Sequence, residues 1–228
     1  MTIFKYALLR GIKNPVSIAG NFIIPLVLIF FDGLWISDYP NGFYFFGFIL
    51  IYGAFTIARG ILNDRQDGTV IRILAGPVTT LRYLTENLLA CMIPMNALTA
   101  VIIIIGSFLY DWKISFALSL MMCYTIFIAA CVSFVFAWSC LFKSKEVSNT
   151  VFSVAAMIMA IMGGLTIPHD MLPEPLRYAG AIFPTHWLSN GISTLLNSGV
   201  TGEYWLSLAA MILFAVAYLL YGGKRRII

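Results

Sequence analysis

Residues 85–110, TENLLACMIPMNALTAVIIIIGSFLY, decide the fold class of this chain. Between Asn87 and Tyr110 the stretch contains no Asp, Glu, Lys or Arg. A helix needs about 20 apolar residues to cross the hydrocarbon core of a bilayer, and this stretch is long enough. We therefore expect a membrane-spanning helix over residues 85–110.

The composition of the whole chain agrees with that stretch. Of its 228 residues, 61% are hydrophobic and 11% are charged, whereas a soluble domain is about 45–50% apolar and about 25% charged. A soluble enzyme, a nucleic-acid-binding protein and a disordered scaffold are thereby excluded. The sequence predicts an all-α polytopic membrane protein, a single transmembrane domain over 1–228, with six spans at residues 16–36, 42–62, 85–110, 114–142, 147–167 and 204–222.

The placement of the charges predicts the topology. With a cytoplasmic N-terminus, only Lys113 and Arg177 of the 14 Lys and Arg residues lie outside. Cytoplasmic loops of membrane proteins carry an excess of Lys and Arg, so this split is the expected one. We expect both termini to be cytoplasmic, in a multi-pass protein of a bacterial-type inner or plasma membrane.

Residues 1–14 are predicted to form an amphipathic helix. At 100° per residue the apolar side chains share one face and the three cations lie opposite. Such a helix lies in the cytoplasmic interface of the bilayer. An ordinary basic membrane anchor is the alternative. The apolar face comprises Ile3, Phe4, Ala7, Leu8 and Ile12, and the cations are Lys5, Arg10 and Lys13.

Residues 63–84 form a charged cytoplasmic segment between the second and third spans. A turn at Gly68 precedes a short helix with Val70, Ile73 and Leu74 on one side, and Gly76–Pro77 ends it. An apolar face on a short helix suits docking into a groove of a soluble partner. The alternative is a solvated loop whose apolar residues fold back on the bilayer.

Residues 168–203 lie outside and are too interrupted by proline to span the membrane. Their many apolar residues nevertheless make exposure to free solvent unfavourable. We expect two short helices, 173–183 and 185–197, that form a re-entrant hairpin in the outer leaflet. Non-helical backbone at membrane depth is tolerated where it lines a cavity, so this hairpin could cap a pathway.

In this order the features resemble the permease subunits of the second ABC transporter family, which includes ABCG-like, drug and antibiotic exporters. The loop match is Asp64–Arg65–Gln66–Asp67–Gly68–Thr69 with Leu74 and Pro77. The hairpin match is Leu172–Pro173–Glu174–Pro175–Leu176 and Phe183–Pro184–Thr185–His186–Trp187. The loop opens with Asp64 where many members carry Glu.

The resemblance implies that two such subunits pair, as a homodimer or heterodimer, and that each docks on a cytoplasmic ABC ATPase, which binds ATP and Mg. Substrate would move outward between the two permeases. The implied coupling residues are Asp64, Arg65, Asp67, Gly68, Thr69, Arg72, Leu74 and Pro77. The candidates for lining the pathway, in the first, second and fifth spans, are Phe22, Phe46, Phe55, Met157 and Met162. The outer gate candidates are Pro173, Pro184 and Trp187.

The motifs of an enzyme are missing from the sequence. No Gly-x-x-x-x-Gly-Lys-Ser/Thr phosphate loop, Gly-x-Ser-x-Gly or His-Glu-x-x-His occurs. We therefore expect no catalytic, cofactor or metal site in this chain. ATP hydrolysis is expected in a separate partner chain.

An ion-coupled secondary transporter is the main alternative function. Such carriers place ionisable residues near the midplane of the bilayer, and the spans here are almost free of them. ATP-driven efflux therefore fits better. The aromatic and Met-rich spans favour a hydrophobic or amphipathic cargo, such as a drug, antibiotic, antimicrobial peptide or lipid, over a polysaccharide or glycolipid. Alternatively, these side chains face lipid or neighbouring helices.

Overall fold

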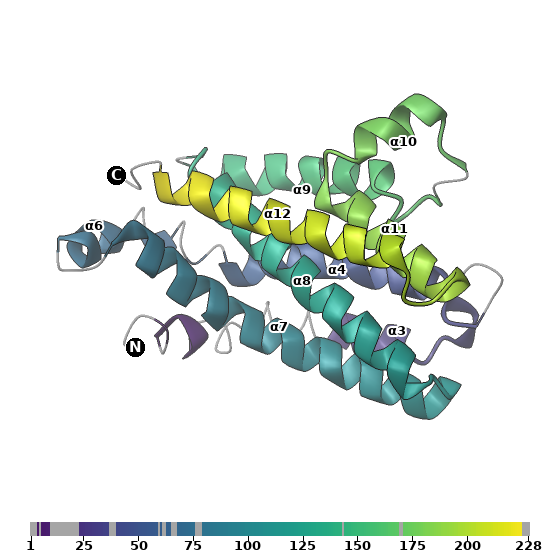
Figure 1. Cartoon of the computed structure of the whole chain (residues 1–228). Helices are drawn as coiled ribbons and strands as arrows, with labels where there is room; N and C mark the ends of the chain where they lie inside the picture. The colour runs from purple at the N-terminus through teal and green to yellow at the C-terminus, as the bar shows by residue number, and fades with distance from the viewer. Residues whose placement is uncertain are drawn as a thin grey trace.

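The computed structural model describes residues 4, 6–9, 23–36, 40–58, 60, 63–64, 68–75, 79–142, 144–168 and 171–224. Over these residues the chain forms helices and no strand (Figure 1). The described part contains five helices that are long and apolar enough to cross a membrane. They are α4 (Asn41–Ala58), α7 (Thr80–Tyr110), α8 (Ile114–Ser139), α9 (Lys145–Met162) and α12 (Gly202–Lys224). The prediction of an all-α multi-pass membrane protein is confirmed.

These five helices lie where the sequence places spans, with differences at their ends. Helix α7 begins at Thr80, before the predicted start at residue 85, because Thr79 caps it. The Thr79 hydroxyl oxygen accepts a hydrogen bond from the backbone N–H of Arg82 at 3.3 Å, which satisfies one of the free donors of the first turn. At its other end α7 stops at Asp111, whose φ of 51° is left-handed.

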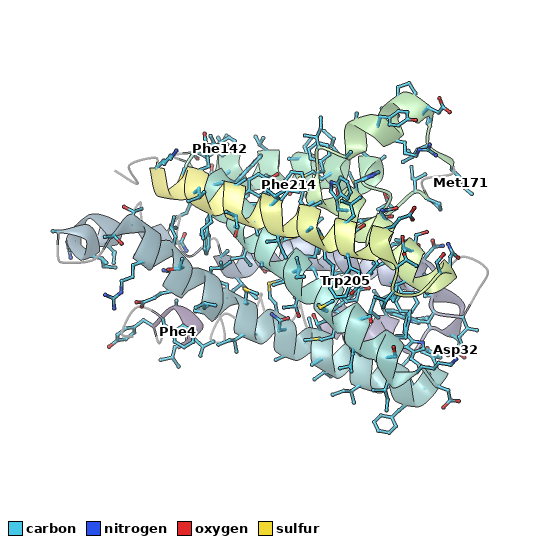
Figure 2. The ribbon with its side chains drawn as sticks, in the orientation of Figure 1. Phe4, Asp32, Phe142, Met171, Trp205 and Phe214 are labelled. Atoms are coloured by element: carbon cyan, nitrogen blue, oxygen red, sulfur yellow. The ribbon has the colours of Figure 1, made fainter. Side chains whose placement is uncertain are left out.

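The predicted first span, residues 16–36, differs at its outer end. Helix α3 (Ile24–Leu28) is followed by the 3-10 helix η2 (Asp32–Leu34), so no continuous helix reaches residue 36. The indole N–H of Trp35 donates to the carbonyl oxygen of Leu28 at 2.9 Å and satisfies a carbonyl at the end of α3. Residues 16–22 lie outside the described residues, so a membrane span over residues 16–36 stays a prediction. Figure 2 places Phe4 and Asp32 at opposite ends of the bundle.

Helix α8 occupies the centre of the bundle and contacts α4, α7, α12 and the outer helix α11 (Pro184–Asn197) (Figure 1). Its buried residues are spread over the whole circumference, among them Cys123, Phe127, Val132 and Phe136. A helix that is apolar on every side is typical of a membrane span or of a protein core. Here α4, α7, α11 and α12 surround it.

Hydrogen bonds between helices fix how the neighbours sit on α8. The Tyr124 hydroxyl donates to the carbonyl oxygen of Phe43 in α4 at 2.7 Å. The Tyr204 hydroxyl of α12 donates to the carbonyl oxygen of Ser119 at 2.6 Å. The Thr125 hydroxyl donates to Oδ1 of Asn96 in α7 at 2.6 Å. In an apolar interior such bonds specify one arrangement, because leaving these polar groups unpaired is costly.

The outer hairpin is formed by α10 (Glu174–Gly180) and α11, close to the predicted 173–183 and 185–197. Two hydroxyls of α11 attach it to the outer end of α9. The Thr185 hydroxyl donates to the carbonyl oxygen of Met159 at 2.7 Å, and the Ser189 hydroxyl donates to that of Gly164 at 3.2 Å. Both hydroxyl-bearing side chains are buried.

Two glycines allow the hairpin to approach α9 closely. A Cβ atom on Gly163 would fall on the side chain of Thr185, and one on Gly180 would fall on the carbonyl oxygen of Met162. The second contact involves backbone, which cannot move aside by changing a rotamer. The packing of α10 against the end of α9 therefore depends on glycine at position 180.

We predict that Gly180→Ala destabilises the chain by about 1–3 kcal/mol, the usual cost of overpacking. The readout is the Tm of the purified protein in detergent. Gly202→Ala is the matched control, since a Cβ there meets nothing within 4 Å. Equal Tm values for the two variants would contradict the proposed clash.

Candidate coupling region and pathway surface

The short helix α6 (Thr69–Leu74) lies at the same end of the bundle as the C-terminal end of α12 (Figure 1). Phe4 and Phe142 also lie at this end, whereas Asp32 and Met171 lie at the opposite end (Figure 2). In the topology that the positive-inside pattern predicts, the first end is the cytoplasmic one, and the two ends are named after this prediction. The segment expected to couple to an ATPase is therefore at the cytoplasmic end of the bundle.

Gly68 starts α6 in the way the sequence predicts. Its φ is +69°, a left-handed conformation that glycine adopts without steric cost. Its carbonyl oxygen accepts the backbone N–H of Arg72 at 3.4 Å. A short helix thus begins directly after a sharp turn.

The orientation of α6 differs from the prediction at Val70. This side chain is fully buried in the core of the chain, and Ile73 is half-buried against the same core. Thr69 and Arg72 are exposed. Of the described side chains of α6, the two apolar ones face the bundle and the two polar ones are exposed.

The remaining predicted coupling residues are described in part. Asp64 is half-buried at the start of the segment. Arg65, Asp67 and Pro77 lie outside the described residues, as does the side chain of Leu74. Their roles stay predictions.

Two residues at the start of α7 bind segments that are distant in the sequence, and the sequence analysis did not find them. The Tyr83 hydroxyl donates to Oδ2 of Asp64 at 2.9 Å. Glu86 accepts from Arg82 at 3.0 Å and from the backbone N–H of Phe4 at 3.4 Å. Only the Arg82–Glu86 pair, spaced i and i+4 on one helix, was visible in the sequence.

The predicted pathway residues fall into two groups. Phe46 packs edge-on against Tyr124 with ring centroids 5.0 Å apart, and Phe55 stacks on Phe152 at 3.9 Å, so both are buried inside the chain. Met157 is 48% exposed. Met162 is half-buried, and Phe22 lies outside the described residues. For Phe46 and Phe55 to line a pathway, α4 would have to move away from α8 and α9.

A different set of side chains on α4 and α9, here called the α4/α9 face, is exposed or half-buried. The Tyr52 hydroxyl donates to the carbonyl oxygen of Ser153 at 3.3 Å and joins the two helices. Along α4, the ring of Phe45 contacts that of Phe48, which in turn contacts that of Tyr52. The face consists of Phe45, Phe48, Tyr52, Thr150, Ser153 and Met157.

The exposed side of α12 is chemically different from the α4/α9 face. Between Trp205 and Leu220 its exposed residues are all apolar, including Leu206, Ile212 and Val216. Such a surface is matched to lipid tails. The α4/α9 face mixes hydroxyls with aromatic rings, a composition typical of subunit contacts within membranes.

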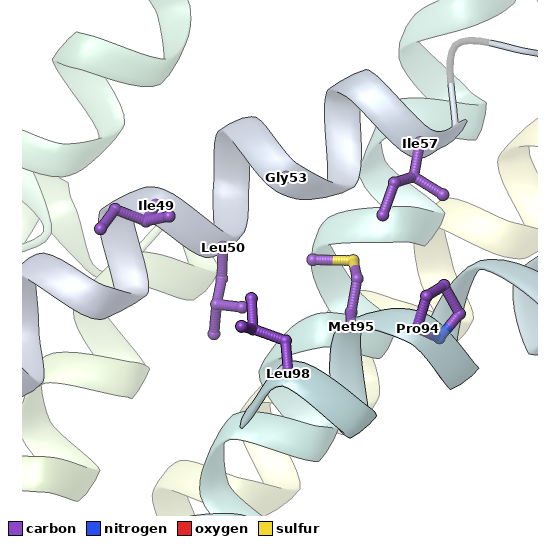
Figure 3. A pocket seen from close by; sticks show the side chains of 7 residues that line it. All are labelled: Ile49, Leu50, Gly53, Ile57, Pro94, Met95 and Leu98. Carbon is purple, nitrogen blue, oxygen red and sulfur yellow. The ribbon is translucent and has the colours of Figure 1, made fainter. Parts of the chain in front are cut away.

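A small apolar cavity lies between α4 and α7 (Figure 3). Its volume is about 10 Å³, which is at the lower limit for one water molecule, and it offers no polar partner. Pro94 interrupts α7 at this place. The lining residues are Ile49, Leu50, Gly53, Ile57, Pro94, Met95 and Leu98.

The predicted outer gate residues sit at three places in the hairpin. Pro173 is exposed before α10, and Pro184 is buried as the first residue of α11. The indole N–H of Trp187 donates to the carbonyl oxygen of Ala181 at 3.0 Å and closes the turn between the helices. Burial, and then the nearby positive charge of Arg177, lower the pKa of His186. This histidine is therefore neutral at physiological pH.

Within the described ranges, no three His, Cys, Asp or Glu side chains are grouped so that they could hold a metal ion. The described features are surfaces and contacts between helices: the exposed Thr69 and Arg72 of α6 at the cytoplasmic end, the α4/α9 face along two spans and the hairpin at the other end.

Comparison with known proteins agrees with this arrangement. Residues 12–223 match the sequence family described as ABC-2 family transporter protein. ABC transporter G family member 38 of Oryza sativa subsp. japonica is 28% identical over a segment that covers 33% of this chain and 7% of that relative. This chain therefore matches only a small part of the relative's length. The family match extends from before α3 almost to the end of α12, and the chain belongs to the ABC-2 family of transporter proteins.

Proposed function

We propose that the chain is the membrane-spanning permease subunit of an ATP-driven exporter. The observation that carries this proposal is α6, a short helix at the cytoplasmic end of the bundle whose Val70 is buried and whose Thr69 and Arg72 are exposed. The ABC-2 family match supports it. A separate ABC ATPase would dock on α6, and movement of that ATPase would move the bundle.

Contact with the ATPase would be made by polar groups. Val70 is buried and anchors α6, whereas Thr69 and Arg72 are exposed. A guanidinium group forms strong charge-assisted hydrogen bonds with carboxylates. An acidic groove on the ATPase is therefore the expected partner surface.

The second permease subunit would pack against the α4/α9 face. When two subunits bring these faces together, they enclose a space between them that is lined by aromatic rings, hydroxyls and Met157. Such a lining suits a hydrophobic or amphipathic cargo, because thioether and aromatic groups adapt to varied apolar shapes. Outward transport is part of the proposal, as is a location in the cell membrane.

We predict that Arg72→Glu lowers stimulation of the cognate ATPase by this chain about tenfold, the effect of losing one hydrogen bond to a charged group. The measurement is ATP hydrolysis by the reconstituted complex. Lys145→Glu is the matched control, because it reverses an exposed charge at the start of α9. Equal stimulation by both variants would show that Arg72 does not meet the ATPase.

We also predict that the purified chain alone hydrolyses no ATP, because its sequence contains no phosphate-binding loop. A phosphate-release assay on a preparation free of the ATPase measures this. Sustained turnover that copurifies with the chain would overturn the need for a separate motor.

The proposed subunit contact predicts cross-linking through α9. In the assembled transporter, Met157→Cys should form a disulfide or a short bismaleimide link across the subunit contact. Val216→Cys on α12 should not, although the two native side chains are 48% and 49% exposed. Gel electrophoresis after oxidation distinguishes the variants. Cross-linking through position 216 alone would place the contact on α12.

A further inference from the structure

The first two turns of α7 contact three other parts of the chain. Tyr83 binds Asp64, which precedes α6, and Glu86 binds the backbone of Phe4. Leu84 is fully buried beside the cytoplasmic end of α12, where a Cβ on Gly222 would lie 3.5 Å from its Cδ1 atom. The start of α7 is thus where the cytoplasmic elements meet.

The contact between Tyr83 and Asp64 combines burial with charge. The Tyr83 side chain is 1% exposed, yet its hydroxyl lies 2.9 Å from Oδ2 of Asp64. A hydrogen bond to a carboxylate is stronger than one between neutral groups, and stronger still in an apolar surrounding. One turn further along α7, the buried Asn87 donates to the carbonyl oxygen of Tyr83 at 2.8 Å and helps to hold this part of the helix.

The described part of the segment that contains α6 is attached both before and after the Gly68 turn. Asp64 binds Tyr83 before the Gly68 turn, and Val70 is buried in the core after it. Between these points the chain carries the left-handed Gly68. A displacement of α6 would act on both the hydrogen bond of Asp64 and the packing of Val70. The hydrogen bond connects the segment directly to Tyr83 in the first turns of α7.

Helix α7 can carry such a displacement into the bundle. It extends over Thr80–Tyr110, and Pro94 inside it removes a backbone donor, which allows the inner part to tilt relative to the outer part. Beyond Pro94, the bond between Asn96 and Thr125 fixes α7 to the central helix α8. Pro94 thus lies between the contact of Tyr83 with Asp64 and the bond that joins α7 to α8.

We propose that Tyr83 and Asp64 form a positioning pair that transmits movement of α6 to the inner half of α7. This inference rests on the proposed function, since it assigns the route by which docking of the ATPase reaches the spans. Neither residue touches cargo or nucleotide. Without the hydrogen bond between Tyr83 and Asp64, α6 would still move when the ATPase moves, but the inner half of α7 would move less.

The experiment measures the two movements separately in the complete complex with its ATPase, in lipid vesicles. In a background without native cysteines, spin labels at positions 75 and 220 report α6, and labels at positions 89 and 220 report the inner half of α7. Ala75, Leu89 and Leu220 are exposed, so each accepts a label. Distances are compared without nucleotide and after trapping with ATP and vanadate.

In the wild-type background both distances should change on trapping. Tyr83→Phe should keep the change at 75/220 and lose about half or more of the change at 89/220, within the range by which such residues alter coupling. Asp64→Leu should act in the same way and serves as the second variant if Tyr83→Phe folds poorly. Asp64→Asn should keep the change in the 89/220 distance, because its amide oxygen can still accept a hydrogen bond from the Tyr83 hydroxyl.

Tyr6→Phe is the matched control, because it removes the hydroxyl of an exposed tyrosine at the same end of the bundle. If the 89/220 distance changes on trapping in Tyr83→Phe and Asp64→Leu as much as in the wild-type background, the positioning pair is overturned and the proposed function is left intact. Absence of any change at 75/220 in the wild-type background would instead overturn docking at α6. The two failures are therefore distinguishable.

Discussion

Hydrogen bonds to the central helix α8 fix the spans α4, α7 and α12 around it. In a bilayer, lipid tails are as apolar as leucine, so the hydrophobic effect does not drive helices together; close packing and hydrogen bonds do. The hydroxyls of Tyr124, Tyr204 and Thr125 supply such bonds toward α4, α12 and α7. Each of these groups fixes the position of one neighbour along α8.

The two ends of the bundle are built differently. At the outer end, hydroxyls of α11 bind carbonyl oxygens at the end of α9, and glycines bring the backbones close, so the hairpin and α9 share many short contacts. At the cytoplasmic end, the described polar contacts converge on the first turns of α7.

The features predictable from the sequence were those that depend on local composition. Long apolar stretches predicted five helices long enough to cross a membrane, and Gly68 marked where a short helix begins. Features that depend on distant partners were not predictable. The first span ends early because Trp35 folds back on Leu28, and Asp64 meets a tyrosine far along the chain. In a span that is apolar on all sides, the periodicity of apolar residues does not show which of them are buried, so the burial of Phe46 and Phe55 was not predictable. The burial of Val70 in the core was not predictable from the short sequence of α6 either.

The hydroxyls of the α4/α9 face have a consequence for biosynthesis. Those of Thr150 and Ser153 donate to the carbonyl oxygens of Glu146 and Asn149, one turn earlier in the same helix. Since each is satisfied within its own helix, the face can meet hydrocarbon at little cost. A chain whose α4/α9 face is uncovered is thus compatible with the bilayer during and after its insertion.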